Sequence, residues 1–245
     1  MPLQRVAEVT SARQDRIAVL EISMGTANTL DYLGLCDLRD SLMAQNGSDC
    51  DAIIITGSGE RSFCMGASAS CRDAGSIASF SELHTVAQEI TGIMRKHTLP
   101  VIALVNGYAL DFGFELALSA DYIISVSGAK FGIPGIKFGF PPLTDIFTDI
   151  TLNIPGWVYR ESKTGSLIDA PRLNEAGVIG KILPPQGFRR NAIDYLKNLN
   201  LDIMKANKSR RKKPPYTVFR NSIFFQLYQP DCTQILGLER FRNTL

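Results

Sequence analysis

One acidic residue in an apolar run is the first candidate for chemistry in this chain. Glu115 lies between Phe114 and Leu116, shortly after a turn with glycines at positions 107 and 113. An apolar environment raises the pKa of a glutamate, so that it can carry a proton near neutral pH. The first turn of a helix leaves its N–H donors unpaired, so the turn before Glu115 could bind an oxyanion. A proton carrier beside an anion-binding turn suits chemistry next to a carbonyl group.

A second glycine-containing turn follows another strand-like run. Residues 53–55 are isoleucines and residue 56 is a threonine. The chain then passes through a glycine-containing turn and continues to Gly66. Gly66 lets the backbone approach a ligand closely, and the N–H of Ala67 could point at that ligand. Alone, a glycine turn after a strand is more often structural than functional. Two strand-to-turn units, each offering one N–H, could nevertheless converge on one oxygen.

The elements that must position these residues alternate between strands and helices. We expect strands at 6–10, 17–22, 52–56, 101–105, 122–125 and 129–131. We expect helices at 30–44, 80–96, 157–163, 171–176, 188–204 and 217–227. The alternation predicts an α/β fold with stacked strand–helix–strand units, and the sparse strand signals after about residue 150 predict a helical C-terminal region.

Composition narrows the class of protein. The chain has 245 residues, enough for one large domain or one domain with a small appendage. Its net charge of +2 favours neither nucleic acid nor a membrane as partner, and no apolar run is long enough to span a bilayer. The N-terminus lacks the apolar core of a signal peptide. Five cysteines without CxxC spacing predict reduced thiols in the cytoplasm and no metal site.

A basic cluster at 205–213, just before Pro214, departs from the even charge distribution. One interpretation is a solvated helix end, because Lys and Arg suit a helix C-terminus and proline stops the helix. The other is a phosphate-binding patch. A single short cluster on a near-neutral chain is weak evidence for nucleic acid.

The order and spacing of several segments resemble the crotonase superfamily, the enoyl-CoA hydratase/isomerase family, along nearly the whole chain. The most specific segment is VNGYALDFGFELALSADYII at 105–124, similar to the family's N-G-x-A-x-G-G-G-x-E-L pattern. SFCMGASA at 62–69 resembles its F-x-x-G-A-D type segment. Supporting segments are ANTL at 27–30, AKFGIPGIKFGF at 129–140 and IDAPRLNEAGVIGKIL at 168–183.

The resemblance implies a crotonase-like α/β fold with a repeated ββα spiral core. We expect residues 1–185 to form this core with its acyl-thioester site, and residues 186–245 to form a helical region that mediates a homotrimer or a dimer of trimers. The substrate would be a thioester of coenzyme A or of an acyl carrier protein, with no permanently bound cofactor. In such a site the thioester oxygen lies between two backbone N–H groups, which fall on Ala67 and Phe112.

The resemblance assigns three further roles to residues of this chain. Glu115 corresponds to the proton carrier. The basic cluster would be placed to meet the phosphates of coenzyme A. Residues expected to contact substrate are Met65, Gly66, Ser68, Asp111, Gly135 and Pro142.

Two departures from the family pattern change the expected chemistry. The usual triple glycine reads Asp111-Phe112-Gly113, so Phe112 must have a negative φ to supply its N–H, and Asp111 adds a carboxylate at the same rim. The second glutamate of the hydratases falls on Gly135. The missing acid argues against plain enoyl-CoA hydration, which uses a pair of carboxylates.

A third departure lies in the loop after Lys137, where the family usually has small residues. Asp145 is a candidate replacement acid, or alternatively the N-cap of the segment that follows. His84 is an outside candidate for catalysis, while His97 fits a helix terminus. Cys64 and Cys71, which flank the turn at Gly66, fit buried structural thiols.

Three functions therefore stay open from the sequence. The first is an isomerase- or hydratase-like enzyme in which Glu115 is a single proton carrier. The second is a decarboxylase of CoA- or carrier-protein-bound acyl thioesters, which needs the anion hole more than a strong base. The third is a degenerate protein of the same fold that binds acyl-CoA without catalysis.

Overall fold

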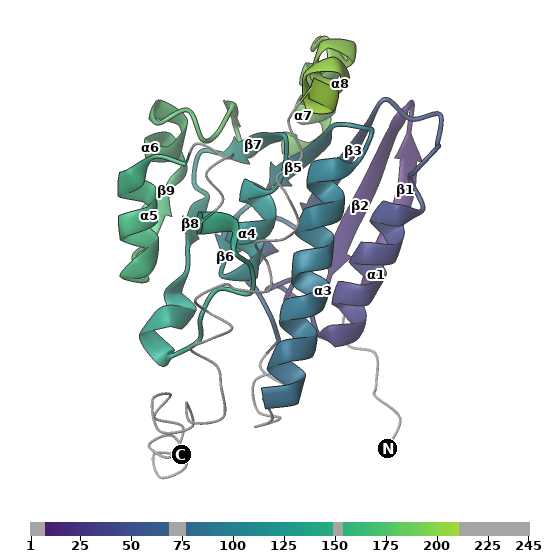
Figure 1. The fold of residues 1–245 in the computed structure, drawn as a ribbon. Helices are drawn as coiled ribbons and strands as arrows, with labels where there is room; N and C mark the ends of the chain where they lie inside the picture. Colours follow the sequence, from purple (N-terminus) through teal and green to yellow (C-terminus); the bar gives the residue numbers. More distant parts are fainter. Residues whose placement is uncertain (1–7, 69–76, 149–153, 211–245) are drawn as a thin grey trace.

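Two sheets of different size organise the protein in the computed structural model, which describes residues 8–68, 77–148 and 154–210 (Figure 1). The larger sheet has the strand order β1 (Glu8–Gln14), β2 (Ile17–Ser23), β3 (Ala52–Gly57), β5 (Val101–Val105), β7 (Tyr122–Val126) and β10 (Lys181–Leu183). Its first pair is antiparallel and all later pairs are parallel. The smaller sheet has the order β4 (Ser62–Cys64), β6 (Tyr108–Leu110), β8 (Lys130–Gly132) and β9 (Ile168–Asp169).

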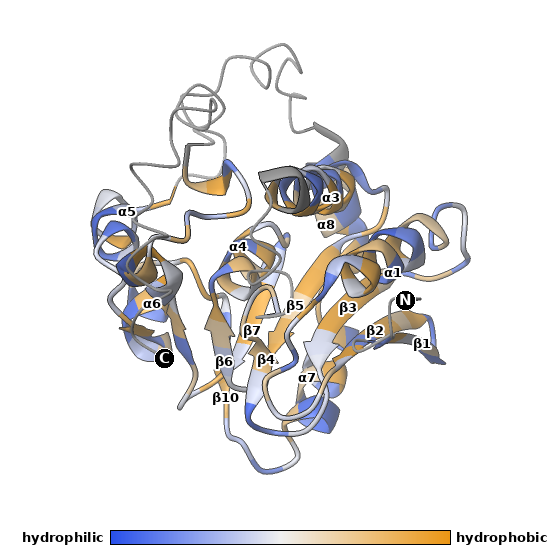
Figure 2. Ribbon diagram, turned by 90° about the horizontal axis from the view of Figure 1, so that it is seen from below, coloured by the Kyte–Doolittle hydropathy of each residue, from blue (hydrophilic) through white to orange (hydrophobic). Residues whose placement is uncertain are grey.

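Helices cover both faces of the larger sheet (Figure 2). They are α1 (Tyr32–Met43), α3 (Ile77–Lys96), α4 (Phe112–Leu118), α5 (Gly156–Lys163), α6 (Ala170–Glu175), α7 (Phe188–Lys197) and α8 (Leu201–Arg210), with short 3₁₀ helices at Pro134–Phe138 and Ile146–Thr148. The central strands β3 and β5 are buried along their whole length, as expected for parallel strands covered on both faces. Helix α4 packs against β4, β5 and β6, between the two sheets.

A repeated unit explains this arrangement. In three successive units, a strand of the larger sheet is followed by a short strand of the smaller sheet and then by a helix: β3–β4–α3, β5–β6–α4, and β7–β8 with the 3₁₀ helix at Pro134–Phe138. This confirms the predicted ββα spiral core. The division of the chain at residue 185 stays a prediction. The trimer also stays a prediction, because the structure contains one chain.

Most long elements lie where the sequence predicts them, with two differences. The helix expected at 188–204 is two helices, α7 and α8, separated at residues 198–200. The Asn200 side chain accepts a hydrogen bond from the Ile203 N–H and starts the second helix. Strands β4, β6, β9 and β10 were not among the expected strands, since each has only two or three residues, too few to show alternation. Among strands this short, only β8 was expected, at 129–131. The helix expected at 217–227 lies outside the described residues.

Helix α8 is attached to the core by lysines that the sequence assigned to a solvated end or a phosphate patch. Lys208 is buried, and its Nζ donates to the carbonyls of Met94 (2.6 Å) and Leu99 (3.0 Å) and to the Asp121 carboxylate (2.5 Å). Lys205 pairs with Asp51 at 3.2 Å. Both interpretations are therefore wrong for Lys208, whose charge is paired inside the protein. Lys205 is ion-paired but partly exposed, and residues 211–213 of the cluster lie outside the described residues.

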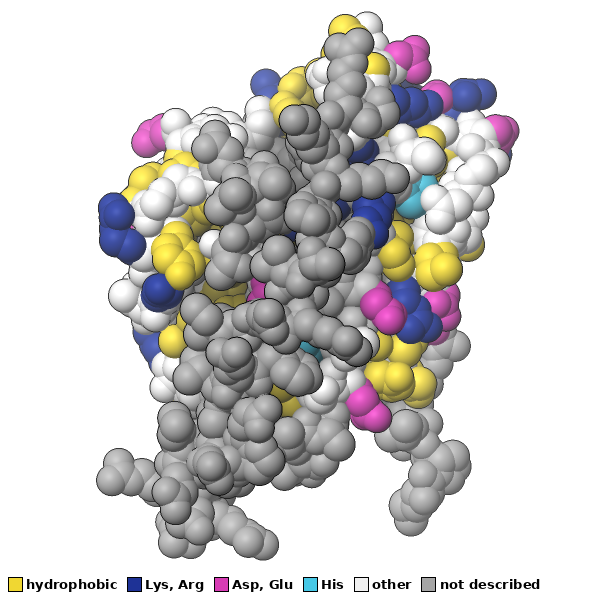
Figure 3. Space-filling model, viewed as in Figure 1, with side chains coloured by type: hydrophobic (Ala, Val, Ile, Leu, Met, Phe, Trp, Pro, Cys, Tyr) yellow, Lys and Arg dark blue, Asp and Glu magenta, His cyan; other side chains and the backbone are white. Residues whose placement is uncertain are grey.

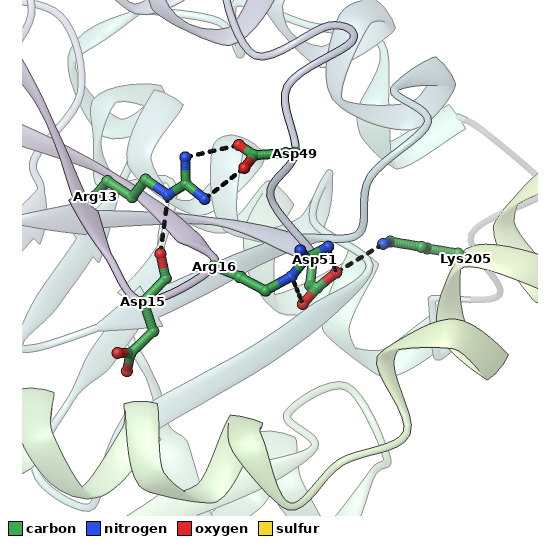
Figure 4. A network of polar contacts seen from close by, with 6 residues as sticks. All are labelled: Arg13, Asp15, Arg16, Asp49, Asp51 and Lys205. Atoms are coloured by element: carbon green, nitrogen blue, oxygen red, sulfur yellow. Dashed lines mark hydrogen bonds and ion pairs between the residues drawn. The ribbon is translucent and has the colours of Figure 1, made fainter.

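The Lys205 pair belongs to a partly exposed network that joins α8 to the β1–β2 turn (Figure 4). Asp51 also accepts two hydrogen bonds from Arg16, at 2.7 and 3.0 Å, and this holds its pKa at about 2. Arg13 makes a similar two-pronged contact with Asp49. Such exposed pairs add little stability, so Lys208 is the main polar anchor of α8.

Surface charge is mixed on the face shown in Figure 3, where Lys and Arg side chains of described residues lie among Asp and Glu side chains. This distribution matches the near-neutral net charge. Within 8–68, 77–148 and 154–210, no helix combines the length and hydrophobicity needed to cross a membrane.

Candidate functional site

Glu115 lies at the start of α4 with its side chain completely buried. One carboxylate oxygen accepts a hydrogen bond from the Leu143 N–H at 2.9 Å. The other accepts from the N–H of Thr144 at 2.6 Å and from its hydroxyl at 2.5 Å. The carboxylate is thus fixed in position by the backbone of a distant loop, as a proton carrier must be to act on one atom of a substrate.

Burial raises the pKa of Glu115 to about 7, well above its usual value of 4.5. The hydrogen bonds from Thr144 and Leu143 favour the charged form and oppose this rise, while the negative charge of Asp111 adds to it. A carboxyl group with this pKa is present in both protonation states near neutral pH. It can therefore both give and take a proton there.

We expect the raised pKa of Glu115 to weaken folding as pH rises. Between pH 4.5 and 7 the unfolded chain ionises this group while the folded chain keeps it protonated, so the free energy of unfolding falls over that interval. At about 1.4 kcal/mol per pH unit, the loss approaches about 3 kcal/mol. Urea unfolding at pH 5 and pH 8 measures it. Glu115→Gln should remove this part of the pH dependence, and an equal pH dependence in both proteins would contradict the prediction.

The two backbone donors expected from the resemblance belong to segments that lie against each other. Phe112 is the first residue of α4, so the helix provides no carbonyl partner for its N–H. Gly66 has a φ of 90°, and a Cβ there would lie 3.4 Å from the Phe112 nitrogen. Ala67 follows Gly66 and forms a bridge with Leu30. The structure therefore brings together the segments of both donors, and their joint action on one oxygen stays a prediction.

Phe112 meets the condition that the sequence set for it. The positive φ in this turn falls on Asp111, at 49°, and not on Phe112. The Phe112 side chain is 1% exposed and belongs to the hydrophobic core. Its ring is therefore part of the packing beneath the turn, while its N–H lies at the N-terminus of α4.

Asp111 and Gly135 are in direct contact. The Asp111 carboxylate accepts a hydrogen bond from the Gly135 N–H at 2.8 Å. A Cβ at Gly135 would lie 2.8 Å from that same carboxylate oxygen. The space where a longer side chain at 135 would begin is thus occupied by the carboxylate of Asp111.

A small pocket of about 80 Å³ lies beside Glu115. Its walls include Ile133, Ile136, Pro142, Thr144, Asp145 and Phe147. Thr144 both lines the pocket and donates to the Glu115 carboxylate, so the pocket and the buried acid are neighbours. The walls are mainly apolar, as in sites that hold the apolar part of a small ligand.

Asp145 also lines this pocket and is partly exposed. The first N–H of the 3₁₀ helix at Ile146–Thr148, that of Ile146, donates to the Thr144 hydroxyl oxygen at 3.3 Å. Burial lowers the pKa of Arg95, and the nearby charge of Asp145 opposes that shift. The role of Asp145 as a replacement acid stays a prediction.

The other predicted site residues lie around the turn at Gly66. The Met65 N–H donates to the Ala27 carbonyl at 3.1 Å, and the Ser68 N–H donates to the Leu30 carbonyl at 2.9 Å. Cys64 is buried, and burial raises the pKa of its thiol to about 12, so it is an unreactive structural thiol. Cys71 lies outside the described residues.

The two histidines lie on α3 and just beyond it. His84 stacks on Phe80 within the helix. His97 directly follows α3, as predicted, and its Nδ1 accepts a hydrogen bond from the Leu99 N–H at 3.0 Å. Burial lowers the pKa of His97. In the described part of the chain, no group of three or more His, Cys, Asp or Glu side chains is placed to hold a metal ion.

Sequence reasoning missed Leu143 and Thr144, the donors that hold Glu115. Two of their three hydrogen bonds come from backbone N–H groups, which leave no mark on residue type. The remaining signal is the Pro141-Pro142 pair before them, since prolines fix the course of a loop.

Known proteins are similar to this chain over most of its length. The model of the enoyl-CoA hydratase/isomerase family matches residues 12–214. A crotonyl-CoA hydratase of Syntrophomonas wolfei is 31% identical over 177 residues, which is 71% of this chain and 68% of the relative. A carnitinyl-CoA dehydratase of Citrobacter koseri is 31% identical over 195 residues, covering 74% of this chain and 70% of the relative.

Solved structures share the fold at lower identity. An enoyl-CoA hydratase from Thermoplasma volcanium superposes with a TM-score of 0.73 at 23% identity, covering 94% of this chain and 96% of that chain. DspI from Pseudomonas aeruginosa superposes with a TM-score of 0.74 at 23% identity, covering 95% and 93%. At these identities the likeness concerns the crotonase fold alone.

Proposed function

The chain belongs to the enoyl-CoA hydratase/isomerase family, and we propose that it moves a proton at the α-carbon of a CoA thioester through Glu115. The observation that carries this proposal is the position of Glu115. Its carboxyl group is buried at the N-terminal end of α4, with a pKa of about 7, three residues after the proposed N–H donor of Phe112. Proton carrier and anion-binding turn are thus built into one helix.

In the proposed reaction, the thioester oxygen accepts hydrogen bonds from the N–H groups of Ala67 and Phe112. These bonds strengthen as the oxygen gains charge in the enolate, and a donor of this kind contributes about 100- to 1000-fold in rate. Glu115 takes the α-proton as carboxylate, or gives one as carboxylic acid. The positive end of the α4 dipole also favours the enolate oxygen.

The pocket at Ile133, Ile136 and Phe147 is proposed to hold the apolar acyl group. Thr144 contacts both this pocket and the Glu115 carboxylate. A substrate that enters the pocket thus lies beside the hydroxyl that holds the acid. The acyl group is accordingly expected to be short.

A panel of thioesters tests the proposal. The wild-type protein is mixed with enoyl-CoA, saturated acyl-CoA and malonyl-CoA substrates, and the products are separated by mass. We expect double-bond isomerisation or hydration of enoyl-CoA, together with deuterium uptake at the α-carbon in D₂O. Carbon dioxide release from malonyl-CoA without these reactions would favour the decarboxylase. Binding of acyl-CoA without any reaction would favour the degenerate protein.

A further inference from the structure

Asp111 lies in a backbone conformation that its residue type disfavours. Its φ is 49° and its ψ is −123°, a region that glycine adopts easily and that strains a residue with a side chain. The backbone fixes this conformation, because the Asp111 N–H donates to the Gly132 carbonyl at 2.9 Å and its carbonyl accepts from the N–H groups of Phe114 and Glu115. An aspartate in a strained backbone conformation is expected to make a side-chain contact that compensates for the strain.

Helix capping is not that compensating contact. Asp111 is at the N-cap of α4, where an aspartate usually accepts a hydrogen bond from an N–H of the first turn. Its side chain makes no such bond. It points instead to the Gly135 N–H. The carboxylate is therefore directed away from the helix that it begins.

Gly135 is complementary to this carboxylate. A Cβ at residue 135 would lie 2.8 Å from one carboxylate oxygen of Asp111 and 3.2 Å from the other. The glycine at 135 and the strained aspartate at 111 therefore form one arrangement, in which either residue makes room for the other. On the opposite side, a Cβ at Gly66 would meet the Cβ of Asp111 at 2.7 Å and the Phe112 nitrogen at 3.4 Å.

The Asp111 carboxylate thus lies at the rim of the proposed anion hole and one helical turn before Glu115. We propose that Asp111 is a second catalytic carboxylate, the base that activates water for addition to the enoyl thioester. This inference rests on the proposed function of Glu115. It returns hydration to the reactions open to this chain, although residue 135 carries no acid.

In the proposed step, Asp111 takes a proton from water as the water oxygen forms a bond to the β-carbon. The electron pair of the double bond forms a new C–H bond at the α-carbon with the proton of Glu115. The product is a 3-hydroxyacyl thioester, with Asp111 protonated and Glu115 ionised. Return of the Asp111 proton to Glu115 through solvent restores the starting state.

Asp111→Asn separates this role from a structural one. Asparagine has nearly the same shape as aspartate and keeps an oxygen that accepts from the Gly135 N–H, but it cannot take the proton of water. We expect enoyl-CoA hydration to fall at least 100-fold, because a general base contributes about 10²- to 10⁴-fold. Deuterium uptake at the α-carbon of a saturated acyl-CoA, which needs Glu115 but no water addition, should fall less than tenfold.

A relocation of the acid gives an independent test. Asp111→Gly removes the strain and the carboxylate and empties the space next to residue 135. Gly135→Glu alone should impair hydration relative to wild type, because the new Cβ collides with the Asp111 carboxylate. In the double variant Asp111→Gly/Gly135→Glu, the new carboxylate can enter the vacated space. We expect hydration at least tenfold faster than in Asp111→Gly alone.

The outcomes distinguish this inference from the proposed function. Hydration within tenfold of wild type in a folded Asp111→Asn protein overturns the role of Asp111, even if Glu115 acts as proposed. A wild-type protein that takes up α-deuterium but hydrates no enoyl-CoA also overturns it. If wild type neither hydrates nor exchanges, the proposed function itself fails.

Discussion

Glu115→Gln is expected to lower kcat for enoyl-CoA turnover by about two to four orders of magnitude, the usual contribution of a positioned acid or base. Glutamine has nearly the same shape and keeps one oxygen that can accept from Leu143 or Thr144, but it carries no proton to the α-carbon. KM should change by only a few-fold, because the N–H donors at the anion hole remain. Steady-state kinetics with the best thioester of the panel measures both constants.

A control for this variant is Glu175→Gln, at an exposed position near the end of α6. Its kcat should stay within a factor of two of wild type. Circular dichroism must show that Glu115→Gln is folded before its rate is interpreted. A folded Glu115→Gln protein with more than a tenth of the wild-type kcat would remove Glu115 from the mechanism.

Lys208→Met is expected to lower the free energy of unfolding by about 3–5 kcal/mol, because it removes the Lys208 counter-charge from the buried Asp121 carboxylate, which also accepts from the Val101 N–H at 2.8 Å. The Lys208 and Asp121 side chains are 4% and 8% exposed, so water cannot replace the lost contact. The carbonyls of Met94 and Leu99 also lose a donor. Urea unfolding at pH 7 measures the difference.

Lys205→Met is the matched control on the same helix. Lys205 and its partner Asp51 are 28% and 32% exposed, and Asp51 keeps its contact with Arg16. Its loss should be about 1 kcal/mol or less. In the double variant Lys208→Met/Asp121→Asn, the loss should be smaller than the sum of the single losses, since no charge is left unpaired. Equal losses for Lys205→Met and Lys208→Met would show that burial does not set the strength of this anchor.

The core strands and the acidic position were accessible from the sequence because they follow from residue type. Residues 52–55 and 101–105 are continuous apolar runs, which parallel strands require when both faces are covered. Glu115 was identified as a single charge among apolar residues, and its burial and raised pKa follow from that setting.

The partners of these residues were not accessible, because they depend on contacts between distant segments. Thr144 reaches Glu115 across 29 positions, and Lys208 reaches Asp121 across 87. A lysine near a helix end is usually solvated, so nothing in the local sequence marks Lys208 as buried. The direction of the Asp111 side chain depends on a positive φ that only the folded turn determines.

Uptake of deuterium at the α-carbon of a saturated acyl-CoA, followed by NMR in D₂O, tests the role of Glu115 most directly. The reaction needs the proton carrier and the anion hole and no further chemistry. We expect measurable exchange by the wild-type protein, at least 100-fold slower exchange by Glu115→Gln, and exchange within tenfold of wild type by Asp111→Asn. Exchange at the wild-type rate in a folded Glu115→Gln protein would contradict this expectation.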